Sequence, residues 1–156
     1  MNAIRHVAAS DCEAIRPGLI GQPANTVSSL ALVAAAVPIA RAARRRSQPA
    51  WIAVAVATAV EGLGSVAYHG PGGHGAKKLH DGGLVALAAA LGVAVGCEGR
   101  PPQRRPLTAV LTVAAVALHA LSRTGGPLCS CRSPLQGHAV FHVLAAAALT
   151  TAAEGR

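Results

Sequence analysis

Aromatic side chains are almost missing from this chain, whose 156 residues include one Trp, one Tyr and one Phe. Proteins that bind single-stranded nucleic acid stack the bases on aromatic rings, so the net charge of +8 does not indicate a nucleic-acid partner. Charged residues are also scarce, at 13% against about 25% in soluble domains. With a mean hydropathy of +0.43, the composition favours a membrane protein. Because much of the apolar content is Ala, a soluble Ala-rich bundle is the alternative.

Five apolar runs divide the chain. A membrane-spanning helix needs about 20 residues, within a range of about 17–25; the first two runs have this length, and the third and fifth reach it with flanking residues. Gly, Ala, Ser and Thr dominate the runs, as in closely packed transmembrane helices, although an aromatic belt is missing. We predict an all-α integral membrane helical bundle of about five transmembrane helices, forming a single domain over residues 1–156. The runs are Ala24–Ala43, Ala50–His69, Gly82–Cys97, Pro106–Ser122 and His138–Ala153.

Arginines are concentrated in the short segments after the first and third runs and at the end of the chain. Lys and Arg are enriched in cytoplasmic loops close to helix ends. We therefore predict that these segments are cytoplasmic, with the N-terminus outside and the C-terminus inside. The residues concerned are Arg41, Arg44, Arg45, Arg46, Arg100, Arg104, Arg105 and Arg156.

Two pairs of polar residues are spaced four apart in the apolar runs. Ser65 and His69 (GSVAYH) end the second run, and His138 and His142 (HAVFH) open the last. Four residues are about one helical turn, so each pair lies on one helix face. With alternating spans, both pairs and Asp81, which opens the third run, fall at the outer membrane face. Ionisable groups inside a membrane are expensive and usually functional, so we expect these residues to form one site.

Three histidines with one open coordination position form a ligand set of catalytic zinc, which lowers the pKa of its bound water to about 7. We therefore predict zinc on His69, His138 and His142. Asp81 would take the proton from that water or orient a ligand. Ser65 would donate a hydrogen bond to an oxyanion.

Simpler interpretations exist for several polar residues. An intramembrane histidine such as His119 often only makes a hydrogen bond between helices. His74 and His80 lie in the Gly-rich stretch PGGHGAKKLHD, where solvated loop histidines are the default, although His80 could substitute as a ligand. Asp81 could be only a helix N-cap, and Ser65 could serve helix packing alone.

The order of motifs resembles a known family. DCE near the N-terminus is followed by IGQPANTVSS, GLGSVAYH, LHDGGL and HAVFH, which is similar to the alkaline ceramidases. These belong to the CREST superfamily of membrane hydrolases, which includes the progestin and adipoQ receptors. The resemblance covers most of the chain up to Asp81 and again from His138. It implies a zinc amidase that cleaves the N-acyl bond of a ceramide-like lipid, with zinc on His69, His138 and His142 and with Ser65 and Asp81 assisting.

The chain departs from this family in two respects. The family has seven spans, so two are missing between the third run and HAVFH; the loss of an even number leaves the last histidines on the same side. The family also binds calcium through an acidic N-terminal segment. Asp11 and Glu13 match part of that segment, but Gln22 stands where a further carboxylate is expected, so the calcium ligand set is incomplete.

Other polar positions surround the predicted site. Asn25, Ser28 and Ser29 match the polar stretch of the family's first span, where we expect a role in helix packing. Glu61 lies one turn before Ser65 on the same face. It is either a buried polar partner of the site or a protonated packing residue.

The four cysteines divide between the two membrane faces. Cys12, Cys129 and Cys131 fall outside and Cys97 inside. Because oxidation is favoured outside the cell, we expect a bridge from Cys12 to Cys129 or Cys131, and similar tethering occurs in the alkaline ceramidases. Alternatively, the C-x-C pair of Cys129 and Cys131 could add metal ligands.

Together these patterns predict metal-dependent hydrolysis of a membrane lipid amide. The main alternative is a progestin/adipoQ receptor-like or hemolysin III-like membrane protein in which zinc is structural. Two further alternatives are a di-histidine haem or quinone protein, which would not need Asp81 and Ser65, and a rhomboid-like serine protease using Ser65. The protease is disfavoured because no histidine is left to pair with the serine.

Overall fold

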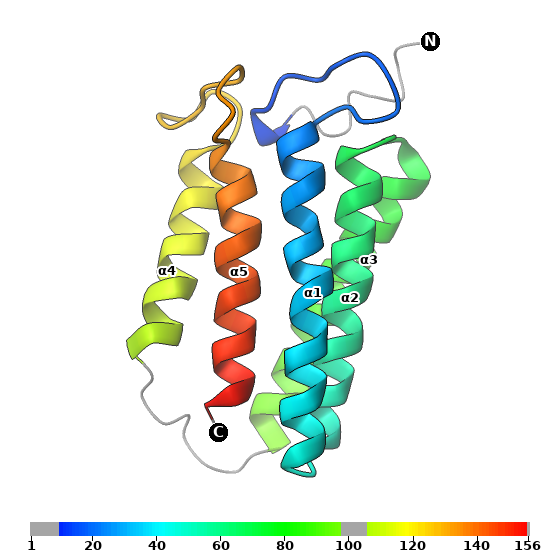
Figure 1. Cartoon of the computed structure of the whole chain (residues 1–156), viewed down its shortest axis with the longest axis vertical. Coiled ribbons are helices and arrows are strands. Elements are labelled where there is room, and N and C mark those ends of the chain that lie inside the picture. The colour runs from blue at the N-terminus through cyan, green and yellow to red at the C-terminus, as the bar shows by residue number, and fades with distance from the viewer. Residues whose placement is uncertain (1–9, 98–105, 156) are drawn as a thin grey trace.

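The structure, a computed structural model, describes residues 10–97 and 106–155. These residues contain five α-helices and no strand (Figure 1). The all-α prediction is therefore confirmed. Arg100, Arg104, Arg105 and Arg156, on which part of the predicted topology rests, lie outside the described residues. The helices are α1 (Pro23–Arg45), α2 (Pro49–His69), α3 (His74–Cys97), α4 (Pro106–Leu121) and α5 (Gly137–Glu154).

Three of these helices, α1, α2 and α3, are long and apolar enough to cross a membrane. Pro38 lies inside α1 without ending it, as transmembrane helices tolerate. α4 is apolar but has only 16 residues, and α5 has 18 residues. The described residues therefore contain three candidate spans, as expected for the membrane protein that the composition predicts. That α4 and α5 also cross the membrane stays a prediction.

Helix α3 begins at His74, eight residues before the start expected at Gly82. Gly72 and Gly73 adopt φ values of 72° and 97°, a region that favours glycine, and this turn reverses the chain after α2. The carbonyl of Gly73 then accepts a hydrogen bond from the backbone N–H of Lys77 at 2.9 Å. The interpretation of His74 and His80 as loop residues is therefore wrong, and so is the interpretation of Asp81 as an N-cap, because the helix has already formed.

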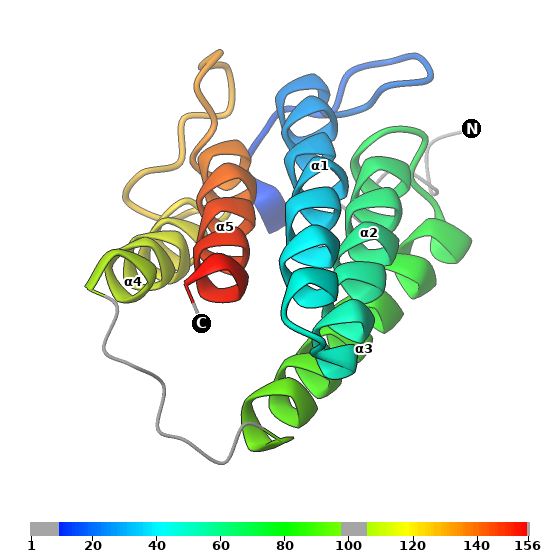
Figure 2. The same cartoon turned by 60° about the horizontal axis from the view of Figure 1, so that its bottom comes forward.

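The helices pack in the order α3–α2–α1–α5–α4, so each contacts mainly its neighbours in this row (Figures 1 and 2). Helices α1 and α2 approach closely at Gly62, where a Cβ atom would lie 2.8 Å from the backbone nitrogen of Val33. α3 and α4 stand at the two ends of the row. The row therefore places the end of α2 and the start of α5 on either side of the start of α1.

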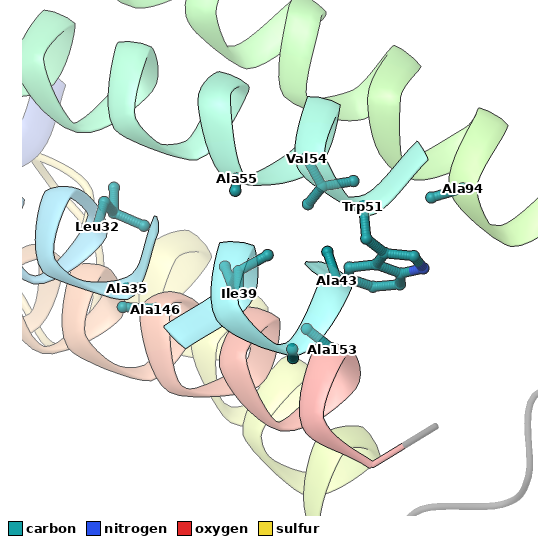
Figure 3. Packing of buried hydrophobic residues seen from close by; sticks show 11 residues of the cluster. Leu32, Ala35, Ile39, Ala43, Trp51, Val54, Ala55, Ala94, Ala146 and Ala153 are labelled. Carbon is teal, nitrogen blue, oxygen red and sulfur yellow. The ribbon is translucent and has the colours of Figure 1, made fainter. Parts of the chain in front are cut away.

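The apolar core lies toward the end of the bundle where α1 ends and α2 begins (Figure 3). Ile39, Trp51 and Val54 are fully buried there, and small alanines from α1, α2, α3 and α5 pack around them. Small residues let helices approach closely where lipid supplies no hydrophobic drive. Arg46 fastens the same end by donating hydrogen bonds to the carbonyls of Ala153 and Glu154. The buried histidines lie at the opposite end of the bundle.

Candidate metal centre

Three histidines from two helices meet at the end of the bundle opposite the apolar core. His69 is the last residue of α2, while His138 and His142 face inward from the first turns of α5. All three side chains are buried. One ligand atom from each lies within 4.8 Å of the other two. The predicted histidine set therefore forms a group that can bind a metal ion.

Two of the three histidines have an Nε2 atom without a partner among the described residues. Nε2 of His69 and Nε2 of His138 are buried and have no hydrogen-bond partner in the described part of the chain. The Nδ1 atoms face polar groups instead: Nδ1 of His69 lies 2.6 Å from Oε1 of Gln22, and Nδ1 of His138 lies 3.9 Å from Asp11. Two buried acceptors without partners are costly, and a shared cation would satisfy both.

Hydrogen bonds to α1 fix the third ring. Nδ1 of His142 lies 2.9 Å from Oγ of Ser28, and the Ser28 hydroxyl donates to the carbonyl of Asn25 at 3.0 Å. Because the serine proton is used there, the serine oxygen accepts from Nδ1–H of His142. This leaves the lone pair on Nε2 of His142 for a ligand, as in metal sites where the outer nitrogen of a histidine is held by a polar partner.

The sequence alone does not predict that Gln22 and Ser28 orient the histidines. Gln22 replaces an expected carboxylate in the calcium segment, and Ser28 was assigned to helix packing. The Gln22 side chain is itself fixed, because its Nε2 donates to the carbonyl of Glu13 at 2.8 Å. The signal was present in the polar stretch GQPANTVSS, but only the fold shows which of its residues face the histidines.

Replacing Gln22 with alanine is expected to lower metal affinity by about 10–100-fold, because loss of an orienting partner typically has that cost. Competition with a chelator of known affinity measures it. Gln48→Ala is the matched control, since Gln48 precedes α2 at the opposite end of the bundle. Equal affinities for the two variants would show that Gln22 does not orient His69.

Ser65 also lies at the site. Its Oγ is 3.3 Å from Nε2 of His142 and 2.9 Å from Oγ of Ser29. The Ser29 hydroxyl donates to the carbonyl of Asn25 at 2.7 Å, so Ser65 donates to Ser29 at rest. The same hydroxyl proton can turn toward a molecule bound beside the histidines.

Comparison with protein-family models, curated proteins and solved structures finds no match for this chain. The resemblance to the alkaline ceramidases therefore rests on the quoted motifs alone and stays a prediction. The histidine geometry is a separate observation that does not depend on that likeness.

The structure does not bring Asp81 to the three histidines. Half of its side chain is exposed, and its carboxylate contacts Lys77 at 2.5 Å and Nδ1 of His80 at 3.3 Å. The neighbouring His80 is turned inward, with its ring centroid 6.4 Å from that of His69. The residue of LHDGGL that lies beside the site is thus the histidine.

The two acidic residues considered for calcium have other contacts. Both carboxylate oxygens of Glu13 accept backbone N–H groups at the start of α1, from Ala24 at 2.9 Å and Asn25 at 2.8 Å. This interaction satisfies donors that a helix N-terminus leaves free. Burial raises the pKa of the Asp11 carboxyl above its ordinary value, and the charge of Arg123 partly opposes this shift. The described residues contain no metal-binding group that includes either carboxylate.

A disulfide joins Cys12 to Cys129, with 5.6 Å between their Cα atoms. Cys97 and Cys131 are free and exposed, so the alternative of a C-x-C metal site is wrong. Near the bridge, the backbone N–H of Ala14 donates to the carbonyl of Cys131 at 3.0 Å. The N-terminal segment is thus fastened to the loop that precedes α5.

His119, interpreted as an interhelix hydrogen bonder, lies on α4 beside the site. Its ring centroid is 5.3 Å from that of His138 and 4.8 Å from that of Phe141. Its buried Nδ1 atom has no hydrogen-bond partner in the described residues. The contacts of His119 are therefore ring contacts, and it stands outside the group of three ligands.

Proposed function

We propose that this protein is a zinc-dependent membrane hydrolase that cleaves the N-acyl amide bond of a ceramide-like lipid. The observation that carries the proposal is the convergence of ligand atoms from three buried histidines, one of which lies beside the hydroxyl of Ser65. Zinc fits this donor set, because catalytic zinc sites typically use three protein ligands such as neutral histidines and keep one position open. The candidate spans favour a lipid substrate, and the order of motifs favours a sphingoid lipid.

The roles of the chain follow from the geometry. When bound, zinc supplies a Lewis acid that polarises a carbonyl and lowers the pKa of water. Gln22 holds the ring of His69 and Ser28 holds that of His142, each through Nδ1, which leaves the Nε2 atoms for the metal. The Ser65 hydroxyl is placed to donate to a carbonyl oxygen as that oxygen gains charge. Burial of the site excludes water, which strengthens each of these interactions.

Metal content and turnover together test the proposal. Purified protein in lipid vesicles should contain about one zinc per chain and release fatty acid from a fluorescent N-acyl sphingoid lipid. Removal of zinc with a chelator should stop release, and added zinc should restore it. Tightly bound zinc without turnover of any N-acyl lipid would instead support the receptor-like or hemolysin III-like alternative, in which zinc is structural.

The proposed orientation places the site at the outer face of the membrane. Arg44 and Arg45 form the last turn of α1, next to Arg46, and such clusters at helix ends favour the cytoplasmic side. The disulfide lies at the other end of the bundle, and an oxidising compartment favours it. These two features point to the same topology.

Labelling with a membrane-impermeant thiol reagent tests this orientation. In a protein whose free Cys97 and Cys131 are replaced by alanine, we expect Lys78→Cys to be labelled in intact cells and Ser47→Cys only after lysis. Both positions are exposed, and Cys12 and Cys129 remain paired. The reverse pattern would place the histidines on the cytoplasmic side and exclude an outer-leaflet substrate, while the metal chemistry would stand.

A further inference from the structure

A histidine lies between a buried carboxyl group and an exposed one at the junction of α2 and α3. Nε2 of His80 is 3.4 Å from Oε1 of Glu61, and Nδ1 of His80 is 3.3 Å from Oδ1 of Asp81. The side chains are 5% exposed for Glu61, 15% for His80 and 51% for Asp81. The imidazole therefore connects the interior of the protein with its surface.

Glu61 is the buried end of this row. It lies within the candidate span α2, and its Oε2 atom is buried without a hydrogen-bond partner in the described residues. A charged carboxylate inside a membrane protein is expensive. A protonated carboxyl avoids this cost, and it can give up its proton only when a neighbouring group stabilises the charge.

Two glycines fix the position of this row. A Cβ atom on Gly64 would lie 2.9 Å from the backbone nitrogen of His80, and one on Gly83 would lie 2.5 Å from Oε2 of Glu61. Atoms that are not bonded to each other do not approach this closely, so only glycine permits this approach of α2 and α3. The contact between Glu61 and His80 is thus built into the backbone packing.

The row lies on the same helix as one of the three histidines. Glu61, Ser65 and His69 are spaced four residues apart and share one helix face. The ring centroid of His80 lies 6.4 Å from that of His69 and 4.7 Å from that of Tyr68. A proton released at the metal centre is therefore close to this row of ionisable side chains.

We propose that Glu61, His80 and Asp81 form a proton relay between the buried site and the aqueous surface. The proposal rests on the hydrolase function proposed above, because amide hydrolysis takes a proton from the attacking water and gives one to the departing amine. In the outward step, the Glu61 carboxyl releases its proton to Nε2 of His80, while Nδ1–H of His80 releases its proton to the Asp81 carboxylate. Asp81 then passes that proton to solvent.

The outward step leaves Glu61 as a carboxylate, which takes a proton from the attacking water and then gives it to the departing amine. The inward step reverses the outward one: Asp81 takes a proton from solvent and gives it to Nδ1 of His80, while Nε2–H of His80 returns its proton to Glu61. The relay thus ends in its starting state with no net change in charge. An exposed carboxylate next to Lys77 exchanges protons with water freely. His80 is the member that the relay cannot lose, since it alone contacts both carboxyl groups.

Turnover and chemical rescue test this role. His80→Ala should keep zinc and fold but lower turnover by about 10²–10⁴-fold, the usual contribution of positioned proton transfer, and added imidazole should restore part of it. His74→Ala is the matched control, because His74 begins the same helix and is exposed, and it should behave as the wild type. A loss that imidazole does not restore would assign His80 to helix packing and overturn the relay.

Infrared spectroscopy supplies a readout that does not depend on turnover. The wild type should show a C=O band of a protonated carboxyl that Glu61→Gln removes. After transfer into heavy water, this band should shift to its deuterated position rapidly in the wild type. The same shift should be slower in His80→Ala. Absence of such a band, or equal exchange in both proteins, would overturn the relay. A wild type that exchanges as expected but cleaves no N-acyl lipid would overturn only the hydrolase proposal.

Discussion

The variant His142→Ala is expected to lose both metal binding and lipid turnover. Its ring supplies one of the three buried ligand atoms, and two histidines cannot complete the ligand set. Partners that only orient a ligand typically contribute about 10–100-fold to metal affinity, so loss of the ligand itself should exceed that range. Metal analysis after dialysis and turnover of the fluorescent lipid measure the two effects.

His119→Ala is the matched control for this experiment. His119 also packs against His138, and it is a histidine on an apolar helix, but it is outside the ligand group. It should retain its metal after dialysis. Full metal content in His142→Ala, or equal loss in both variants, would contradict the assignment of His69, His138 and His142.

Reduction of the disulfide is expected to lower thermal stability and to speed the loss of metal. Cys12 and Cys129 are 117 residues apart, and the chain-entropy model gives about 4.7 kcal/mol for a loop of about 100 residues. That value is an upper limit here, because the unfolded state of a membrane protein keeps its helices inserted, which leaves less entropy for a bridge to remove.

Thermal unfolding with and without reductant measures this effect. Cys12→Ser should unfold at a lower temperature than the wild type and should not respond to reductant. Cys131→Ser is the control, because Cys131 is exposed and unpaired, and it should respond like the wild type. Identical melting temperatures for Cys12→Ser and the wild type would show that the bridge does not stabilise the fold.

Helix identity and the histidine set could be predicted from the sequence, because both depend on local spacing. Apolar runs specify helices, and a spacing of four residues places His138 and His142 on one face whatever the rest of the chain does. The pairing of His69 with them followed from alternating spans. These inferences needed no knowledge of side-chain packing.

The choice between His80 and Asp81 could not be made in the same way. Neighbouring residues on a helix point about 100° apart, so the motif LHDGGL places one of them toward the site only when the start of the helix is known. The turn at Gly72 and Gly73 sets that start, and the polar stretch after it was mistaken for a loop. Gln22 was missed for a related reason, because its contact with His69 joins residues 47 positions apart.

The N-terminal segment lies over the end of the bundle that holds the histidines. On one side, the backbone N–H groups of Gly21 and Gln22 donate to the carbonyls of Gly70 and His69. On the other, the disulfide and the hydrogen bond from Ala14 to Cys131 hold the segment against the loop before α5. In the orientation proposed above, a molecule dissolved in water would meet this cover first, whereas one dissolved in the bilayer would meet the helices. Partition into the membrane, rather than recognition of a head group, would then select the molecules that reach the histidines, and a short-chain amide with the same scissile bond would be a poor substrate.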